Sequence, residues 1–303
     1  MKSTFIIEGD KHRGHALAFS PAKINIGLYV LRKRPDNYHD ILSVLHFIPF
    51  YDTIEVWWEE SPEDSFSIQI YGSNSIIPGN DSCTKTLKII RDYVQDRPTY
   101  KIHLYLLKNI FVGGGLGGGS SNAVAFLKIL SWLYDITGDL QEIALKIGAD
   151  APFFLINTPT ALVSEVGTVV RTFPSCLTAR KLLLANPGFE SSTEVAYQSL
   201  TPDMFGAPQN YPEILISEKP AEWKDKVENI FERILFERHP ALKNLKDFLY
   251  EEGAEYVSLT GTGSTIYAIF PVEFKINMSR ISHSFPDFTF KVIYPFLESF
   301  SGS

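Results

Sequence analysis

The sequence predicts an α+β protein with two domains. The chain has 303 residues, a length that suits one large domain or two of ordinary size. Some segments alternate apolar and polar residues, as half-buried strands do, and others carry apolar residues every three or four positions, as amphipathic helices do. An apolar run at residues 181–187 is typical of a buried strand that begins a second domain. We therefore expect an N-terminal domain over residues 1–175 and a C-terminal domain over residues 176–303.

The composition is that of a globular protein without a strong positive field. Hydrophobic residues make up 45% of the chain and charged residues 21%. Lys and Arg number 28 against 35 Asp and Glu, so the formal net charge is -7. A chain this acidic does not attract nucleic acid as a whole, and any phosphate must be bound at a local site. The sequence thus predicts no nucleic-acid partner.

The cysteines and the apolar segments indicate a cytoplasmic protein. Cys83 and Cys176 lie far apart in the sequence, which favours reduced thiols over a disulfide or a metal site. Residues 1–19 have no apolar core of signal-peptide length, and no run of about eighteen apolar residues occurs. We expect no membrane association.

The first clear strand pattern lies in residues 20–30. Every second position from Ile24 to Val30 is apolar, as on the buried face of a strand. Lys23 and Asn25 share the opposite face, because side chains two positions apart point the same way. Taken alone, these two side chains are most simply explained as solvated.

Further elements follow in order along the chain. Turn residues stand at positions 35–37, and Gly148 suits the end of a helix. We expect strands or apolar strand-like segments at residues 41–50, 52–58, 66–71, 100–106 and 181–187, within 256–270 and at 288–293, and a hairpin at 161–172. We expect helices at residues 84–94, 121–134, 140–147, 223–236 and 240–251, with one more opening at 191–193.

Asp150 precedes a short helical segment. It stands two residues before Pro152, which is tolerated in the first turn of a helix. N-capping alone would account for an aspartate at this position.

A glycine-rich stretch at residues 111–122 is the most specific signal in the chain. It contains six glycines in the seven positions 113–119 and lies between a strand pattern and a helix pattern. Ser120 or Ser121 is a good N-cap for that helix. Glycine permits close approach of the backbone to a ligand, and the N-terminus of a helix presents N–H groups and a partial positive charge. The stretch therefore suits a phosphate group.

A Walker A loop, a dinucleotide-binding turn and a flexible linker all fit this stretch less well. A Walker A loop would have a Lys directly after the last glycine, whereas Lys128 lies two turns into the helix. Gly113, Gly115 and Gly118 match the dinucleotide pattern, but the acidic residue expected to end the second strand is lacking. A flexible linker is disfavoured by the strand and helix patterns on either side.

Three motifs occur in order along the chain. Pro-Ala-Lys-Ile-Asn at residues 21–25 precedes Asn-Tyr-His at 37–39, the glycine-rich stretch precedes Gly-Ala-Asp-Ala-Pro-Phe at 148–153, and Leu-Thr-Gly-Thr-Gly stands at 259–263. Together they resemble the motifs of the GHMP kinase superfamily. The first motif and the Gly-Leu-Gly-Gly-Gly-Ser-Ser-Asn form of the glycine stretch are most similar to the branch that phosphorylates 4-diphosphocytidyl-2-C-methyl-D-erythritol in the non-mevalonate isoprenoid pathway.

The resemblance implies a fold and a set of roles. The fold would have an N-terminal domain like domain 2 of ribosomal protein S5 and a ferredoxin-like C-terminal domain. ATP, with Mg2+, would phosphorylate the 2-hydroxyl group of a cytidyl diphosphate alcohol, with Asp150 as general base and Lys23 as its electrostatic partner. The residues implied to bind ATP are Lys108, Gly113, Gly114, Gly115, Leu116, Gly117, Gly118, Gly119, Ser120, Ser121 and Asn122. The residues implied to bind the alcohol substrate are Asn25, Tyr38, His39, Ser192, Thr193, Gly261, Thr262 and Gly263.

Physical chemistry supports these roles. Phosphoryl transfer depends mainly on positioning and on neutralising the phosphates, and a carboxylate within reach of an alcohol can take its proton. Tyr38 offers a flat face to a pyrimidine, a stacking contact worth about 1–3 kcal/mol. We expect a monomer or a weak homodimer whose partner is the small-molecule substrate.

The chain departs from the usual motifs at three places. Thr260 stands where Ser is commoner, and it keeps a hydroxyl group. Asn37 stands where Gly is typical before Tyr-His, which is tolerable because Asn also accepts left-handed backbone geometry. Residues 80–83 differ from the usual Asn-Leu pair, so we expect contacts there with adenosine to differ from the usual ones.

Three rival functions are compatible with parts of the pattern. A second kinase of the superfamily, for homoserine or mevalonate, is disfavoured by Tyr38 and His39, because those substrates have no base to stack. A catalytically silent nucleotide-binding relative is opposed by Lys23 and Asp150. An RNA-binding module with an S5-like fold is opposed by the net charge of -7.

Overall fold

The computed structural model describes residues 5–73, 76, 78–94, 98–156 and 158–294 of the chain. Helices and strands are mixed along the sequence, which confirms the predicted α+β class. The chain divides into two compact units that are discontinuous in sequence. Unit 1 comprises Met1–Ala22, Phe50–Val112 and Gly117–Asn157, and unit 2 comprises Lys23–Pro49, Gly113–Leu116 and Thr158–Ser303. The boundary between residues 175 and 176 stays a prediction.

The sheet of unit 1 is built largely from long antiparallel strands. Its members are β1 (Phe5–Gly9), the first part of β2 (Arg13–Lys33), the last part of β3 (His39–Glu60), β5 (Tyr100–Leu107) and β4 (Ser65–Tyr71). β1 pairs antiparallel with β2, and β3 pairs antiparallel with β5. β4 lies at the edge and pairs parallel with β5.

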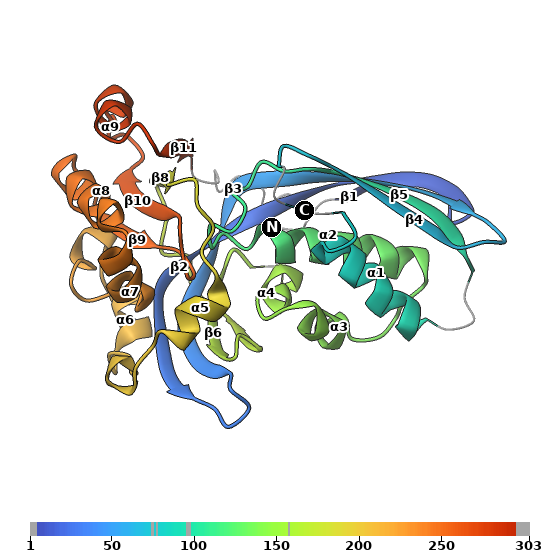
Figure 1. Cartoon of the computed structure of the whole chain (residues 1–303), viewed down its shortest axis with the longest axis horizontal. Helices are drawn as coiled ribbons and strands as arrows, with labels where there is room; N and C mark the ends of the chain where they lie inside the picture. Colours follow the sequence, from blue (N-terminus) through green and yellow to red (C-terminus); the bar gives the residue numbers. More distant parts are fainter. Residues whose placement is uncertain (1–4, 74–75, 77, 95–97, 157, 295–303) are drawn as a thin grey trace. The chain divides into compact units, whose positions relative to one another are not determined.

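Four helices lie on one face of this sheet (Figure 1). They are α1 (Ser82–Tyr93), α2 (Gly118–Leu133), α3 (Leu140–Ile147) and α4 (Ala151–Leu155). α2 is the central one, because almost its whole length from Ser121 to Leu133 is buried. Phe126 stacks on Phe66 of the sheet, with ring centroids 6.0 Å apart. This packing fixes the position of the N-terminus of α2 against the sheet of the same unit.

Unit 2 contains a second, antiparallel sheet. Its strand order is β11 (Thr289–Ile293), β8 (Arg180–Asn186), β10 (Ile266–Pro271) and β9 (Tyr256–Leu259). The helices of this unit are α5 (Thr193–Gln198), α6 (Tyr211–Ser217), α7 (Phe231–Arg238), α8 (Pro240–Glu251) and α9 (Met278–Ser284), with short 3-10 turns at Pro202–Met204 and Pro220–Glu222. α7, α8 and α9 enclose the apolar core with this sheet.

The predicted hairpin is also present in unit 2. β6 (Thr160–Glu165) and β7 (Val169–Thr172) pair antiparallel on either side of Gly167, which confirms the expectation. β6 pairs in turn with the first part of β3, from Ile41 to His46.

Several predicted boundaries are wrong. β1 and the start of β2 were not expected, because Arg13, His15 and their neighbours hide the alternation of small buried residues such as Ala16 and Ala18. The segments predicted at 41–50 and 52–58 form one strand, β3. Residues 223–230 precede α7 rather than belong to it, because Glu228 and Ile230 hydrogen-bond through their backbones to Leu28.

The expected N-cap of α2 is wrong as well. The helix begins at Gly118, and its N-cap is Gly117, which has a left-handed backbone at φ 71°. Ser120 and Ser121 therefore lie in the first turn of the helix. None of the helices among the described residues has the length and apolar character to cross a membrane.

Candidate active site

The glycine stretch has the backbone geometry of an anion-binding loop. The φ angles of Gly113, Gly115 and Gly117 are positive, at 63°, 77° and 71°, whereas those of the intervening residues are not. Alternation of left-handed and ordinary backbone turns successive N–H groups toward one concavity, as in the nests that bind phosphate. At Gly115 an added Cβ would lie only 2.1 Å from the carbonyl oxygen of Thr260, so no other residue fits there.

The carbonyl groups of residues 113–116 all have hydrogen-bond partners within unit 2. The oxygen atoms of Gly113, Gly114 and Leu116 accept from the backbone N–H groups of Ser191 (3.2 Å), Thr265 (3.2 Å) and Lys23 (2.9 Å). The oxygen of Gly115 accepts from the hydroxyl group of Thr260 at 3.2 Å. Carbonyl oxygens repel a phosphate. Because all four accept hydrogen bonds from other residues, the N–H side of each peptide group is left for an anion.

The N-terminus of α2 adds further groups suited to a phosphate. The first N–H groups of a helix, here from Gly118 onward, have no partner within the helix. Within the described part of the chain, the side-chain oxygens of Ser121 and Asn122 are buried and have no hydrogen-bond partner. Buried polar atoms are nearly always satisfied in folded proteins, so these two oxygens indicate a ligand or an ordered water. The N–H groups thus fit a nucleotide phosphate, whereas the two side-chain oxygens fit its metal ion, because the Asn122 oxygen can only accept a hydrogen bond or bind a cation.

Lys108 lies in a buried ion pair beside this helix terminus. Its ammonium group donates to Asp52, and the side chains are 3% and 0% exposed. Asp52 also accepts the backbone N–H groups of Asn109 (2.7 Å) and Ile110 (2.8 Å). A Cβ added to Gly118 would lie 3.2 Å from the Lys108 nitrogen, so the pair abuts the glycine stretch. The contact of Lys108 with ATP stays a prediction.

Residues 80–83, where the chain departs from the usual motif, organise the start of α1. Asp81 caps the helix, accepting the Thr84 N–H at 2.8 Å and the Thr84 hydroxyl at 2.7 Å. The next residue, Ser82, donates its hydroxyl to the carbonyl oxygen of Gly119 at 2.7 Å. One of the residues that depart from the usual motif therefore hydrogen-bonds directly to the first turn of α2.

Asp150 stands immediately before α4 but does not cap it. The backbone of Asp150 is helical, and its side chain makes no capping hydrogen bond. Capping alone therefore does not explain this aspartate. Gly148, two residues earlier, lies close to Ser120, because a Cβ at Gly148 would be 3.8 Å from the Ser120 hydroxyl oxygen.

Two lysines hold the segment that carries Asp150. Lys85 of α1 donates to the carbonyl oxygen of Ile147 at the end of α3, at 2.7 Å. Lys128 of α2 donates to the carbonyl oxygen of Phe154 at the end of α4, at 3.0 Å. Burial lowers the pKa of Lys128 to about 8. Cations at helix C-termini are favourable, so these contacts fix the turn between α3 and α4 from both ends.

Lys23 and Asn25 lie on β2 in unit 2, and both are buried. Their exposed fractions are 3% and 4%, so the explanation of a solvated pair is wrong. The Lys23 ammonium donates to the Asn25 side-chain oxygen at 2.7 Å, and the Gly261 N–H donates to the same oxygen at 2.9 Å. The Asn25 amide donates to the hydroxyl of Ser43 at 2.9 Å, and Ser43 donates to the carbonyl of Gly27 at 2.7 Å. Asn25 thus joins the first motif to the last.

The last motif forms the turn between β9 and β10. Ser191 donates its hydroxyl to the carbonyl of Thr262 at 2.7 Å, and the hydroxyl groups of Thr193 and Thr262 lie 3.3 Å apart. Ser192 is exposed and caps α5, its hydroxyl accepting the Val195 N–H at 3.3 Å. Gly263 is restricted, because a Cβ there would lie 2.6 Å from the Leu235 side chain. The structure therefore brings Thr193 and residues 261–263 together.

Tyr38 and His39 follow the tight turn between β2 and β3. Asn37 has φ 67°, which confirms the expected left-handed geometry. The Tyr38 side chain is 66% exposed, so it is available to a ligand. The His39 ring contacts those of Tyr197 and Phe205, with centroids 5.1 Å and 6.0 Å away. Partial burial lowers the pKa of His39, and the nearby positive charge of Lys33 lowers it further.

Several residues of this site were not expected from the sequence. Asp52 had one signal, since a carboxylate between an apolar run and a strand rarely stays buried without a partner. No pattern in the sequence indicates Ser191, Ser43 or Asn229, because the side chain of each hydrogen-bonds to a segment that is remote in the chain.

Comparison with known proteins agrees with this geometry. Residues 82–158 match the GHMP kinases N terminal domain, and residues 215–276 match the GHMP kinases C terminal domain. A relative from Cytophaga hutchinsonii, named 4-diphosphocytidyl-2-C-methyl-D-erythritol kinase, is 34% identical over 273 residues, covering 88% of this chain and 97% of its own. A relative of the same name from Parabacteroides distasonis is 38% identical over 269 residues, covering 86% and 94%.

Solved structures share the fold. The crystal structure of a 4-(cytidine 5'-diphospho)-2C-methyl-D-erythritol kinase has a TM-score of 0.71 and 24% identity, covering 92% of this chain and 99% of its own. The homoserine kinase from Cytophaga hutchinsonii has a TM-score of 0.61 and 14% identity, covering 90% and 93%. The predicted two-domain GHMP kinase fold is confirmed. The chain belongs to the GHMP kinase superfamily, in the family of the 4-diphosphocytidyl-2-C-methyl-D-erythritol kinases.

Proposed function

We propose that the protein is an ATP-dependent kinase that phosphorylates the 2-hydroxyl group of 4-diphosphocytidyl-2-C-methyl-D-erythritol, a step of non-mevalonate isoprenoid biosynthesis. One observation supports the kinase chemistry most strongly. Every carbonyl group of residues 113–116 accepts a hydrogen bond from elsewhere in the chain, and the stretch continues directly into the N-terminus of α2. The names of the relatives from Cytophaga hutchinsonii and Parabacteroides distasonis support the choice of acceptor.

In this proposal the glycine stretch binds the ATP phosphates. The N–H groups at the start of α2 and the helix dipole favour negative charge at that point. Ser120, Ser121 and Asn122 offer side-chain oxygens there, and oxygen atoms are the ligands that Mg2+ prefers. When bound, Mg2+ supplies neutralisation of the phosphate charge. The ion pair of Lys108 with Asp52 keeps the turn before α2 in place.

Asp150 and Lys23 are proposed to act on the reacting groups, which are the substrate hydroxyl and the phosphoryl group that it receives. Asp150 would accept the proton of the substrate hydroxyl, and Lys23 would stabilise the negative charge that develops on the reacting oxygens. Asn25 keeps the Lys23 ammonium in one orientation through the 2.7 Å hydrogen bond. Such positioning is most of what an enzyme contributes to phosphoryl transfer.

The cytosine would be bound by Tyr38 and His39. The Tyr38 ring is exposed for stacking. The pKa of His39 lies below its ordinary value, so its imidazole is neutral near pH 7 and can both donate and accept a hydrogen bond. Ser192, Thr193 and residues 261–263 are proposed to line the substrate side.

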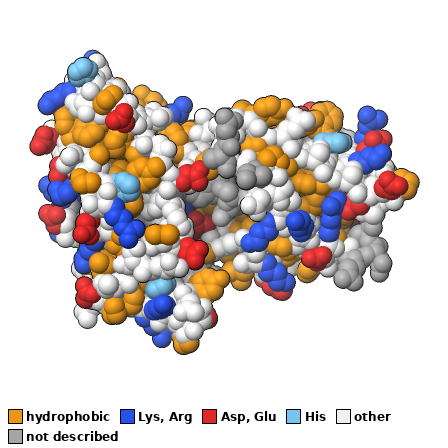
Figure 2. All heavy atoms as spheres, in the orientation of Figure 1, with side chains coloured by type: hydrophobic (Ala, Val, Ile, Leu, Met, Phe, Trp, Pro, Cys, Tyr) orange, Lys and Arg blue, Asp and Glu red, His pale blue; other side chains and the backbone are white. Residues whose placement is uncertain are grey.

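The remaining expectations on partners and location are part of the proposal. Acidic and basic side chains are both distributed over the face that Figure 2 shows, which supports small molecules rather than nucleic acid as ligands. A cytoplasmic location is supported by Cys83 and Cys176, which are both free thiols. A monomer or weak homodimer stays a prediction.

Comparison of acceptors tests the proposed function. The protein is mixed with ATP, Mg2+ and one of three alcohols, and ADP release is followed. We expect turnover with 4-diphosphocytidyl-2-C-methyl-D-erythritol and rates at least about 1000-fold lower with homoserine and mevalonate, because a site built to bind a base loses that binding energy without one. Equal or faster turnover of homoserine or mevalonate would show that the acceptor is wrong. Absence of ATP binding would contradict the kinase itself.

A further inference from the structure

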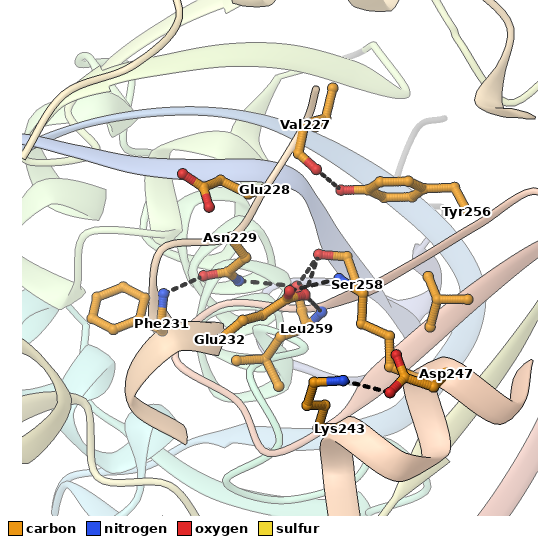
Figure 3. Close-up of polar contacts among 12 residues, drawn as sticks. Val227, Glu228, Asn229, Phe231, Glu232, Lys243, Asp247, Tyr256, Ser258 and Leu259 are labelled. Carbon is orange, nitrogen blue, oxygen red and sulfur yellow. Dashed lines mark hydrogen bonds and ion pairs between the residues drawn. The ribbon is translucent and has the colours of Figure 1, made fainter. Parts of the chain in front are cut away.

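The side chain of Asn229 is fully buried, and both the nitrogen and the oxygen of its amide are hydrogen-bonded. Its nitrogen donates to the carbonyl oxygens of Leu259 (2.9 Å) and Gly261 (2.8 Å), and its oxygen accepts the N–H of Phe231 at 3.0 Å. Figure 3 shows Asn229 between Phe231 and Leu259. The opposite amide orientation would place its oxygen against two carbonyl oxygens, so the hydrogen bonds fix this one.

Gly261 connects Asn229 to the predicted catalytic residues. Its carbonyl is held by Asn229, while its N–H donates to the side-chain oxygen of Asn25 at 2.9 Å. The same Asn25 oxygen accepts the Lys23 ammonium at 2.7 Å. The Thr260 hydroxyl also donates to this oxygen, at 3.3 Å, so two of its three donors come from the turn at residues 260–261. The position of Gly261 therefore helps to determine where the Asn25 oxygen, and with it the Lys23 ammonium, can lie.

The Gly261 turn has little freedom to find another position. Gly261 has φ 56°, and a Cβ there would lie 3.1 Å from both the Cα and the oxygen of Gly115. Thr260, one residue earlier, contacts the oxygen of Gly115. A shift of this turn would therefore disturb the glycine stretch as well as Asn25.

We propose that Asn229 is a positioning residue for the phosphoryl-transfer site, acting through Gly261 and Asn25 on the Lys23 ammonium. The inference rests on the proposed function only in that Lys23 takes part in the reaction. Asn229 itself lies beneath the turn and contacts protein groups on all its polar atoms. Its loss therefore acts indirectly, through the position of the Gly261 turn, and we expect kcat to change more than either KM.

The neighbouring cluster around Glu232 provides a matched control. Glu232 accepts the Ser258 hydroxyl at 2.9 Å and the Leu259 N–H at 2.8 Å, and it pairs with Lys246 at 2.6 Å. Figure 3 shows Glu232, Ser258 and Leu259 next to Asn229. Ser258 is as fully buried as Asn229 and supports the same end of β9, but its hydrogen bonds go to Glu232 and to Leu259 rather than to Gly261. Ser258→Ala thus reports on general damage to this region.

Kinetics of three variants test the inference. Asn229→Asp keeps the shape but sets a carboxylate oxygen against two carbonyls, and Asn229→Ser removes those hydrogen bonds without adding charge. We expect kcat to fall about 10- to 100-fold in both, the range expected for lost hydrogen bonds to a positioned group, and each KM to change by a smaller factor. Ser258→Ala should keep kcat within about 3-fold. Wild-type kcat in a folded Asn229 variant would overturn the inference.

A double-mutant cycle tests the route through Asn25. If Asn229 acts through Asn25, the two changes are not independent. Asn229→Ser combined with Asn25→Ala should then lower kcat no further than Asn25→Ala alone. Fully multiplicative losses would show that Asn229 acts elsewhere, and the inference would fall.

Hydrogen exchange of the Gly261 amide provides a readout that does not need turnover. Protection of this N–H should drop in Asn229→Ser and stay as in wild type in Ser258→Ala; unchanged protection in Asn229→Ser overturns the inference. An inactive wild-type enzyme would contradict the proposed function and leave this result intact. If neither Asn229 variant folds, hydrogen exchange is measured in Asn25→Ala instead. Loss of protection at the Gly261 amide, with protection retained at the Asn229 side-chain amide, supports the connection through Gly261. Unchanged protection of the Gly261 amide overturns the inference.

Discussion

The ammonium group of Lys23 and the side-chain oxygen of Asn25 lie 2.7 Å apart on one strand, and both residues are almost completely buried. A positive charge in such a place needs its hydrogen bonds. Asn25→Ala should therefore lower kcat about 10- to 100-fold, the effect of losing a hydrogen bond to a charged group. Steady-state kinetics with the cytidyl substrate measures it.

Ser43→Ala provides the control for this prediction. Ser43 touches the amide nitrogen of Asn25 and leaves the oxygen that faces Lys23 unchanged. We expect a loss of stability of about 1 kcal/mol and a kcat within a few-fold of wild type. A larger fall of kcat in Ser43→Ala than in Asn25→Ala would contradict the role given to the Asn25 oxygen.

Gly115→Ala should damage both stability and ATP binding. The alanine would adopt φ 77° and place its Cβ 2.1 Å from the oxygen of Thr260. The left-handed conformation costs roughly 1–2 kcal/mol, and overpacking adds about 1–3 kcal/mol. Urea unfolding and an ATP titration measure the two effects.

Gly188→Ala separates backbone strain from the clash. Gly188 has φ 82°, close to that of Gly115, but an added Cβ meets no atom within 4 Å. Its free energy of unfolding should fall only by the conformational cost of roughly 1–2 kcal/mol, and it should bind ATP as the wild type does. Equal losses in the two variants would show that the contact of Gly115 with Thr260 is unimportant.

Breaking the Lys108–Asp52 pair should be strongly destabilising. Asp52→Asn keeps an oxygen for the Asn109 and Ile110 amides but leaves the buried Lys108 ammonium without its carboxylate. Loss of one partner of a buried pair costs about 3–5 kcal/mol, and replacing both partners costs less. The double change Asp52→Asn with Lys108→Met should therefore recover part of the stability in urea unfolding.

The exposed pair of Lys243 and Asp247 is the matched comparison (Figure 3). Its side chains are 60% and 54% exposed, so Asp247→Asn should change stability by no more than about 1 kcal/mol. If Asp52→Asn is as mild as Asp247→Asn, the ion pair beside Gly118 does not stabilise the protein.

His46 should make the protein less stable in acid. Burial lowers its pKa from 6.5 to about 4, partly offset by the hydrogen bond to the carbonyl of Phe47 at 2.6 Å. Because that carbonyl can only accept, the Nδ1 atom carries the hydrogen. The folded state thus keeps a neutral ring that the unfolded chain protonates more readily. The stability from this group is present above pH 6.5 and is lost as the pH falls toward about 4, by about 3 kcal/mol in total.

His46→Asn should remove this dependence. Unfolding free energies of wild type and variant, measured by urea between pH 7 and pH 4, should converge as the pH falls, because only the wild type loses the contribution of the histidine. Parallel curves over this range would contradict the assignment.

The sequence reveals most of the local structure and the glycine stretch. Periodic apolar positions placed the helices α1, α3 and α8 and the strand β5, because each buries one face against a single core. The start of α2 was misplaced, since capping preferences favour Ser over Gly although a left-handed Gly117 ends the loop. Local preference decides such a boundary only when tertiary contacts do not.

Contacts between distant segments account for what the sequence could not reveal. Asp52 and Lys108 are 56 residues apart, and Asn229 and Gly261 are 32 residues apart. Only the fold brings such pairs together, so neither spacing nor periodicity indicates them. The pattern of a single strand likewise does not reveal that both faces of the strand are covered, so taken alone it does not indicate that Lys23 is buried.

Identification of the phosphorylated product tests the central claim most directly. Wild type and Asp150→Asn are each incubated with ATP, Mg2+ and 4-diphosphocytidyl-2-C-methyl-D-erythritol in a single turnover, and phosphorus NMR locates the new phosphate. We predict a 2-phosphate formed by the wild type and a rate lower by at least about 100-fold in Asp150→Asn, as expected for loss of a general base. Transfer to another hydroxyl, no transfer by the wild type, or an undiminished rate in Asp150→Asn would contradict the account.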